Sequence, residues 1–168
     1  MKKILFVLLL IFITNLGCKK ITNGGGLCAC SPITYDTSLG LVIKNSTDVD
    51  LLNPKTTGFL DKTQIQLYAK DANDVIKKIS FDIRQPFTYT NNLKMDYYQL
   101  VSSEISREAK SIDNTFYLKL GEKLYELNLK VNNQMVEKLL INKTDAPKEL
   151  PNVNNEYINS IYTLKFKE

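Results

Sequence analysis

The stretch NTFYLKLGEKLYELNLKVNNQMVEKLLIN, residues 114–142, decides the fold because apolar and polar side chains alternate along three successive runs. Period-two alternation places the apolar side chains on one face of a β-strand. The runs are separated by Gly121-Glu122 and Asn132-Asn133, and both Gly and Asn accept the positive φ angles that short hairpin turns require. The stretch therefore predicts a three-stranded antiparallel meander with one apolar face. Its apolar positions are Phe116, Leu118, Leu120, Tyr125, Leu127, Leu129, Val131, Leu139 and Ile141.

The same alternation occurs on both sides of this stretch. It is present in LGLVIKN (39–45), TQIQLYAK (63–70), KKISFDIRQ (77–85) and YTLKF (162–166). Each of these segments predicts one strand with a single buried face. The inward-facing positions are Leu41, Ile43, Ile65, Leu67, Ala69, Ile79, Phe81, Ile83, Tyr162, Leu164 and Phe166.

About eight short strands joined by short turns predict two sheets packed face to face or one closed barrel. A parallel sheet would need crossover helices of about a dozen residues. The one helical candidate is QLVSSEISREAKS (99–111), which is equally compatible with a strand to Val101 followed by a loop. We predict an all-β domain over residues 39–168, an antiparallel β-sandwich of immunoglobulin-like or transthyretin-like shape, because the strands are short for a ligand-holding barrel.

Composition and charge limit the function classes. The 168 residues include no His, so the commonest general base and transition-metal ligand is missing and an enzyme is disfavoured. The formal net charge is +4, and it falls to +2 without Lys2 and Lys3, which lie in a segment that we expect to be removed. This small excess does not favour nucleic-acid binding.

The first 17 residues have the parts of a signal peptide. Two lysines follow Met1, then comes the apolar run ILFVLLLIFI (4–13), and then TNLG (14–17). A charged start, a short apolar run and a small residue before the cut are typical of export signals. The run is too short for a permanent membrane helix, which needs about 20 apolar residues.

The next residue is Cys18, and NLGC (15–18) resembles the lipobox of bacterial lipoproteins, in which a small residue directly precedes a cysteine. The resemblance implies that Cys18 receives a diacylglyceryl group, that cleavage occurs before it, and that the new amine is acylated with a fatty acid such as palmitate. Two acyl chains suffice for stable membrane anchoring. The alternative is ordinary secretion with Cys18 as a free or paired thiol.

Residues 18–38 predict a flexible tether, because they contain three consecutive glycines and few core-forming residues. A tether of this length spans ~25 Å on average. Lys19 and Lys20 would lie at the lipid surface, where each basic residue contributes ~1 kcal/mol near an anionic leaflet. The face of the membrane stays open, with the periplasmic face slightly favoured.

Cys28 and Cys30 lie within this tether. Exported proteins meet an oxidising compartment, but the Cα atoms of residues i and i+2 lie ~6.5 Å apart along a strand, so a vicinal disulfide needs a tight turn. Two thiolates without a third ligand make a poor metal site. Unassigned thiols are favoured first, a vicinal disulfide second and a metal site last, and we expect no cofactor.

Other polar groups offer weaker candidates. The carboxylates of Asp48 and Asp50, and the group Asp71, Asn73 and Asp74, could bind calcium, but both patterns lack the glycine and distal glutamate of a calcium loop. Asp and Asn are also the residues that turns use. We therefore favour turns at both places.

Three other patterns in the sequence could also indicate a function. The segment SSEISREAK (102–110) lacks the Ser-x-x-Lys spacing of a catalytic dyad and is interpreted as surface. Tyr97 and Tyr98 could stack on a sugar or peptide, although alternation places one of them in the core. Residues 45–47 and 142–144 match the glycosylation acceptor pattern, but in a bacterium this pattern carries no reliable prediction.

The domain itself also resembles a family. The segments LGLVIKNSTDVDLLNP (39–54), IQLYAK (65–70), TFYLKLGEKLYELNL (115–129) and YTLKF (162–166) are similar to small lipoproteins of the phylum Bacteroidota that have no assigned activity. This resemblance implies an extracytoplasmic β domain and transfers no catalytic residue.

Three functions follow as hypotheses. The first is a lipid-anchored, non-enzymatic binding or accessory module of the cell envelope with an unknown protein or glycan partner and no nucleic acid. The second is a small-ligand carrier with a hollow β-barrel. The third is a hydrolase in which two carboxylates converge about 5 to 10 Å apart in a cleft.

Overall fold

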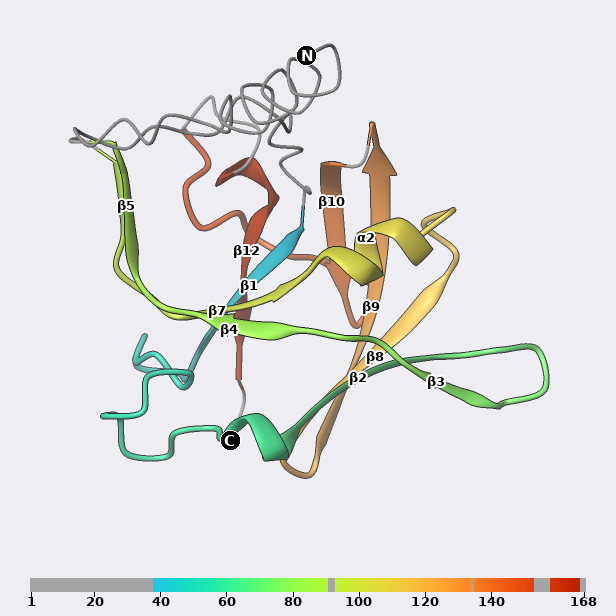
Figure 1. Cartoon of the computed structure of the whole chain (residues 1–168), viewed down its shortest axis with the longest axis horizontal. Helices are drawn as coiled ribbons and strands as arrows, with labels where there is room; N and C mark the ends of the chain where they lie inside the picture. The colour runs from blue at the N-terminus through green and yellow to red at the C-terminus, as the bar shows by residue number, and fades with distance from the viewer. Residues whose placement is uncertain (1–37, 91–92, 134, 153–157, 167–168) are drawn as a thin grey trace, which may run out of the picture. The chain divides into compact units, whose positions relative to one another are not determined.

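The computed structural model describes residues 38–90, 93–133, 135–152 and 158–166. They form an all-β structure in which short helical segments accompany the strands (Figure 1). The predicted signal peptide and Cys18, Cys28 and Cys30 lie outside the described residues. None of the helices described is long and apolar enough to cross a membrane.

The larger of the two main sheets has six strands in the order β11-β10-β9-β8-β2-β3, and all neighbours are antiparallel. Its strands are β2 (Ile65–Lys70), β3 (Ile76–Lys78), β8 (Thr115–Leu120), β9 (Lys123–Asn132), β10 (Met135–Ile141) and β11 (Thr144–Asp145). The predicted meander is confirmed as β8-β9-β10. Its two turns pass through Gly121 (φ +57°) and Asn133 (φ +47°), the residue types that tolerate these angles.

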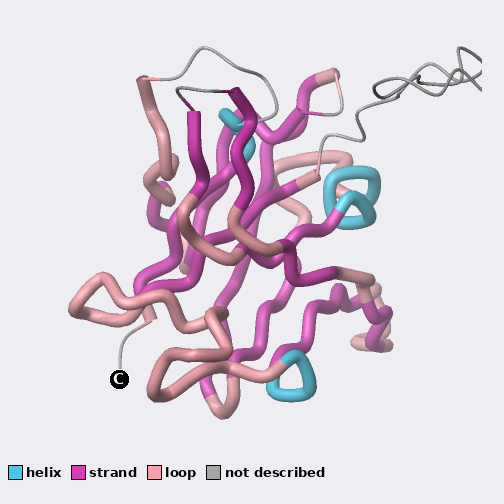
Figure 2. Tube along the Cα trace, turned by 60° about the vertical axis from the view of Figure 1, so that its left-hand side comes forward, coloured by secondary structure: helices cyan, strands magenta, loops and turns pink. Residues whose placement is uncertain are grey.

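The smaller sheet has four strands in the order β12-β1-β7-β4, and a separate hairpin is formed by β5 and β6. The strands are β1 (Leu39–Lys44), β4 (Asp82–Arg84), β5 (Phe87–Thr90), β6 (Leu93–Met95), β7 (Gln99–Ser102) and β12 (Ile161–Lys165). Helical segments lie at the margins of the strands (Figure 2). They are the 3₁₀ turns η1 (Lys62–Gln64) and η2 (Ile158–Ser160) and the helix α2 (Ser103–Glu108).

One hydrophobic core lies between the two main sheets. It joins Leu41 and Leu164 of the smaller sheet with Leu67, Leu118 and Leu127 of the larger sheet, all at most 3% exposed. The Tyr162 hydroxyl bridges the sheets by donating to the carbonyl of Val136 at 3.0 Å, and burial raises the pKa of Tyr162 to about 12. The predicted sandwich is therefore confirmed.

The interior between the sheets is filled by these side chains, and the sheets do not close into a barrel within the residues described. The described residues therefore do not form the hollow interior that the carrier hypothesis requires. A second, smaller core covers the outer face of the four-stranded sheet. Val42 and Ile161 pack there against Met95 of the β5–β6 hairpin and Ile158 of η2.

The expectation of a purely antiparallel structure is wrong at one place, because β1 and β12 are parallel neighbours. No crossover helix is needed, since the intervening residues build the rest of the domain before the chain returns. The two strands approach closely at Gly40, where an added Cβ would lie 3.0 Å from Cγ1 of Ile161. A glycine therefore permits this close contact.

The single strand predicted over residues 77–85 is two strands in different sheets. After β3 the chain leaves the larger sheet and enters the smaller sheet as β4. The bend is held by side chains that lie far away in sequence: the Ser80 amide donates to Glu104 at 2.8 Å, and the Ser102 hydroxyl donates to the Ser80 carbonyl at 2.7 Å. The inward positions are still predicted correctly, because Ile79 is buried and Phe81 and Ile83 pack against the core.

Two further expectations differ in detail. The described residues contain twelve strands rather than about eight, because several strands are only two to four residues long. The helical candidate at 99–111 is part strand and part helix. Strand β7 ends at Ser102, whose hydroxyl caps α2 by accepting from the Ile105 amide at 3.2 Å.

Candidate functional site

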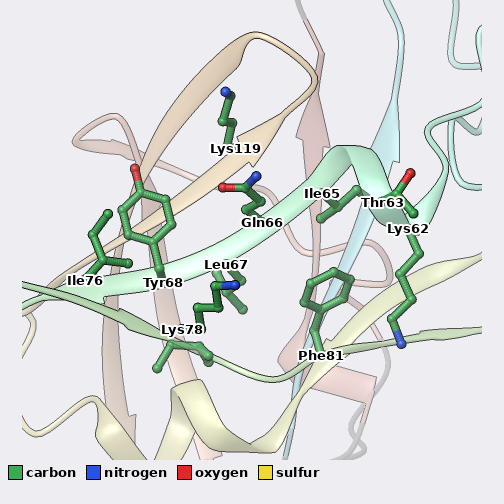
Figure 3. Close-up of a pocket in the computed structure, with 11 residues that line it drawn as sticks. Lys62, Thr63, Ile65, Gln66, Leu67, Tyr68, Ile76, Lys78, Phe81 and Lys119 are labelled. Atoms are coloured by element: carbon green, nitrogen blue, oxygen red, sulfur yellow. The ribbon is translucent and has the colours of Figure 1, made fainter.

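A groove with a volume of ≈ 580 Å³ lies beside β2, where β3 separates from it (Figure 3). The two strands are paired at Tyr68 and Lys78, and the last bond between them runs from the Ile79 amide to the Leu67 carbonyl at 2.8 Å. Beyond this bond the chain turns toward the other sheet. The groove lies between β2, the 3₁₀ turn η1 and the segment that leaves β3.

The floor of the groove is apolar and buried. It consists of Ile65, Leu67 and Ile79, which are 3–4% exposed and belong to the main core. The turn η1 forms one end and is fixed by a capping box, in which Asp61 accepts from the Thr63 amide at 2.9 Å and the Asp61 amide donates to Gln64. The core therefore supports the groove from below, and the capped turn fixes one of its ends.

The rim of the groove is basic. Lys62, Lys78 and Lys119 come from three different elements, and no Asp or Glu is among the described residues that line the groove. Lys62 pairs with the exposed carboxylate of Asp82 at 2.8 Å. Lys78 and Lys119 form no salt bridge with any residue that the structure describes. The groove thus has an unbalanced positive charge.

Aromatic and amide side chains complete the rim. Tyr68 is stacked on Tyr117 of the neighbouring strand, with ring centroids 5.3 Å apart and planes 20° apart. Gln66 and Lys119 form the adjacent cross-strand pair, and Phe81 lies on the opposite side of the groove (Figure 3). The combination of ring faces, an amide and ammonium groups is suited to binding a polar, negatively charged molecule.

A second polar cluster lies on the outer face of the smaller sheet. The Lys44 ammonium contacts Glu149 at 2.7 Å, with side chains only 9% and 10% exposed, and it lies 3.7 Å from the ring centroid of Tyr97. The Thr163 hydroxyl donates to the same carboxylate. Because its groups bond to one another, this cluster is a structural ion pair and offers no free group to a ligand.

Asp50 is the buried carboxylate next to this cluster. Its oxygens accept from the Leu52 amide at 2.9 Å and from the Tyr98 amide at 2.8 Å. Burial nevertheless raises the pKa of Asp50, and the backbone bonds and the charge of Lys44 only partly counter this effect. Asp50 therefore anchors two loops and presents no oxygen as a convergent catalytic group.

The predicted turns are confirmed. Asp48 has φ +64° and pairs with Lys165, an interaction that lowers the pKa of the Asp48 carboxyl. The Asp71 carboxylate accepts from the amides of Asn73 and Val75 at 2.8 and 2.9 Å, and Asp74 has φ +61°. In the described parts of the chain, no three His, Cys, Asp or Glu side chains are grouped to hold a metal ion.

The other candidate residues from the sequence have packing or turn roles in the structure. Tyr97 packs against the smaller core and Tyr98 against the main core, so neither ring is a free platform. Ser106 is buried and accepts from the Leu39 amide at 3.2 Å, whereas Lys110 is exposed, so these residues form no dyad. Asn142 has φ +49° and belongs to a turn.

The sequence did not single out the groove residues. The alternation in residues 63–70 places Gln66 and Tyr68 on the outward face of one strand, but their pairing with Lys119 and Tyr117 requires β2 and β8 to be neighbours. Lys78 joins them only because β3 pairs with β2. A signal was present in the basic and aromatic outward positions of both strands, but the sequence does not reveal their order in the sheet.

The described residues form an all-β sandwich with a groove on its larger sheet. The chain matches no family model, and comparisons with curated proteins and with solved structures give no significant match. The finer likeness to immunoglobulin-like or transthyretin-like sandwiches therefore stays a prediction. The predicted roles of Cys18, Cys28 and Cys30 concern residues outside those described.

Proposed function

We propose that this protein is a lipid-anchored, non-enzymatic binding or accessory protein of the bacterial cell envelope. The anchoring is supported by the sequence, in which a charged start and the apolar run 4–13 lead directly to Gly17 and Cys18. The tether that the sequence predicts over residues 18–38 would then connect the acylated cysteine to the β domain. The resemblance to Bacteroidota lipoproteins supports the same location.

The observation that carries the binding role is the groove beside β2. Its floor is part of the main core, so the described residues form a surface groove over a packed interior. Its described lining contains basic, aromatic and amide side chains, which bind polar molecules, and no pair of carboxylates of the kind that a hydrolase needs. These features support a binding module over the carrier and the hydrolase.

The anchoring can be tested with the full-length protein expressed in a bacterial host that processes lipoproteins. We expect the wild type to partition with membranes and into a detergent phase, and the peptide beginning at Cys18 to carry acyl mass. The Cys18→Ser variant should lose both properties. Cys28→Ser and Cys30→Ser are matched controls, because each removes one thiol from the tether and should leave partitioning unchanged. A Cys18→Ser protein that still partitions fully with membranes would refute the proposed anchor.

A further inference from the structure

We propose that the groove beside β2 binds an acidic saccharide, a sugar chain that carries carboxylate or sulfate groups. This inference rests on the proposed binding function and deepens it by naming the class of ligand. It is carried by the groove alone and requires no part of the chain outside the described residues.

The charge of the groove selects an anionic ligand. Lys78 and Lys119 line it from β3 and β8, and neither ammonium is in a salt bridge with a described residue. Lys62 at the third side is more than half exposed, and its partner Asp82 is exposed as well, so an anion can compete for this ammonium. Carboxylate and sulfate groups at intervals along a ligand would match three separated point charges.

The side chains between the lysines select a ring with polar substituents. The Tyr68 ring stacks on Tyr117 and lies beside Gln66 at the rim of the groove (Figure 3). Aromatic faces pack against the C–H faces of sugar rings, and the Gln66 amide and the Thr63 hydroxyl can bond with sugar hydroxyls. The volume of ≈ 580 Å³ is within the range of small-molecule sites and has room for a short oligosaccharide.

An acidic peptide fits less well. A peptide that binds by strand addition needs a long free sheet edge, but β3 occupies the edge of β2 from Tyr68 to Lys70 and the Ile79 amide bonds to the Leu67 carbonyl, so only the short start of β2 is free at the groove. The edge strand β3 is only three residues long and contains two lysines, a composition that opposes strand addition.

Nucleic acid and lipid also fit less well. The formal charge of the whole chain is only +4, which is small for a protein that binds the phosphate backbone of nucleic acid. An acyl chain needs an apolar slot, whereas the apolar floor of the groove is 3–4% exposed and offers little contact area.

The test is calorimetric titration of the full-length protein in detergent micelles. The acidic probes are oligogalacturonate, which carries carboxylates, and carrageenan oligosaccharide, which carries sulfates, so the two arms separate the sources of charge. A maltooligosaccharide of equal length, polyglutamate and a single-stranded oligonucleotide are the comparison ligands. We expect at least one acidic saccharide to bind, to bind more weakly as salt rises, and to bind more tightly than every comparison ligand.

Two double variants place the binding in the groove. Lys78→Gln with Lys119→Gln should weaken binding at least about fivefold, because two charge-assisted contacts are lost. Lys55→Gln with Lys110→Gln makes the same change in net charge at exposed positions outside the groove and should leave affinity unchanged. Tyr68→Leu should also weaken binding, and circular dichroism of each variant checks that the fold is intact.

Several results would overturn the inference. They are no binding of either acidic saccharide, equal loss in the two double variants, or equal affinity for polyglutamate or the oligonucleotide. Binding of the neutral saccharide alone, with loss in Tyr68→Leu, would also reject the acidic ligand while preserving the proposed binding function. A failure of the proposed lipid anchor is distinguished from these binding results, because the anchor is tested by the membrane partitioning of the Cys18→Ser variant.

Discussion

Replacing Lys44 with Met would leave the Glu149 carboxylate in its buried position without its cation. The two groups are 2.7 Å apart with side chains 9% and 10% exposed. Removing one partner of such a pair costs ~3–5 kcal/mol in general, because the remaining charge is neither hydrated nor paired. The Thr163 hydroxyl still donates to Glu149, which favours the lower end, about 3 kcal/mol.

The companion variant Glu149→Leu should have a similar cost, since it leaves the Lys44 ammonium buried next to the Tyr97 ring. The double variant Lys44→Met with Glu149→Leu should be less destabilised than either single variant, because no unpaired charge is left in the protein interior. The expected coupling therefore has the opposite sign to the two single effects.

Urea unfolding followed by far-ultraviolet circular dichroism of the full chain measures these effects. With a slope of ~2 kcal/mol per molar urea, a loss of ~3 kcal/mol moves the midpoint down by about 1.5 M. Lys138→Met is a suitable control, because its salt bridge with Asp145 is exposed and should contribute less than about 1 kcal/mol. Additive single effects, or a Lys44→Met midpoint equal to that of the control, would refute the assignment of a buried pair.

Two further predictions concern the core and the pH dependence. Leu118→Ala, at a fully buried position between the sheets, should destabilise the fold by about 3 kcal/mol. Leu124→Ala, at a 51% exposed position, should cost under about 1 kcal/mol. Thermal melts of the two variants compare these losses, and equal losses would contradict the packing described. The raised pKa of Asp50 means that the folded state binds this proton more tightly than the unfolded chain, so the contribution of Asp50 to stability falls as pH rises from the ordinary value of 3.8 through the higher folded pKa. The stability of the wild type relative to Asp50→Asn should therefore be greater at pH 3.5 than at pH 7 in urea titrations, and a difference that does not change with pH would show that burial does not govern this carboxyl.

The predictable part of the fold is the part built from local contacts. The meander follows from alternation and from turn residues at Gly121 and Asn133, which lie between strands that are adjacent in sequence. The parallel pairing of β1 with β12 depends on contacts between residues about 120 positions apart, for which one sequence contains no local signal. Period-two patterns give the buried face of a strand but not the identity of its neighbours.

The break between β3 and β4 could not be predicted for a different reason. The alternation continues without interruption from Ile79 to Ile83, and the bend is fixed by hydrogen bonds at Ser80, whose amide donates to Glu104 and whose carbonyl accepts from the Ser102 hydroxyl. The groove exists because of this bend, so its residues could be predicted only as outward-facing positions and not as a site. Conversely, the turn roles of Asp71 and Asp48 were predictable, because Asp71 accepts from an amide within its own turn and Asp48 has a positive φ that Asp tolerates.

The parallel pair at one edge of the smaller sheet also has a consequence for the order of folding. Strand β1 lies between β12 and β7, so the first described strand cannot gain both of its neighbours until the last strand is available. During synthesis from the amino terminus the meander can form earlier, since its strands are joined by short turns, while β1 waits with one edge unpaired. A chain truncated before Ile161 would therefore retain the local hairpins but lose the ladder that joins the beginning of the domain to its end.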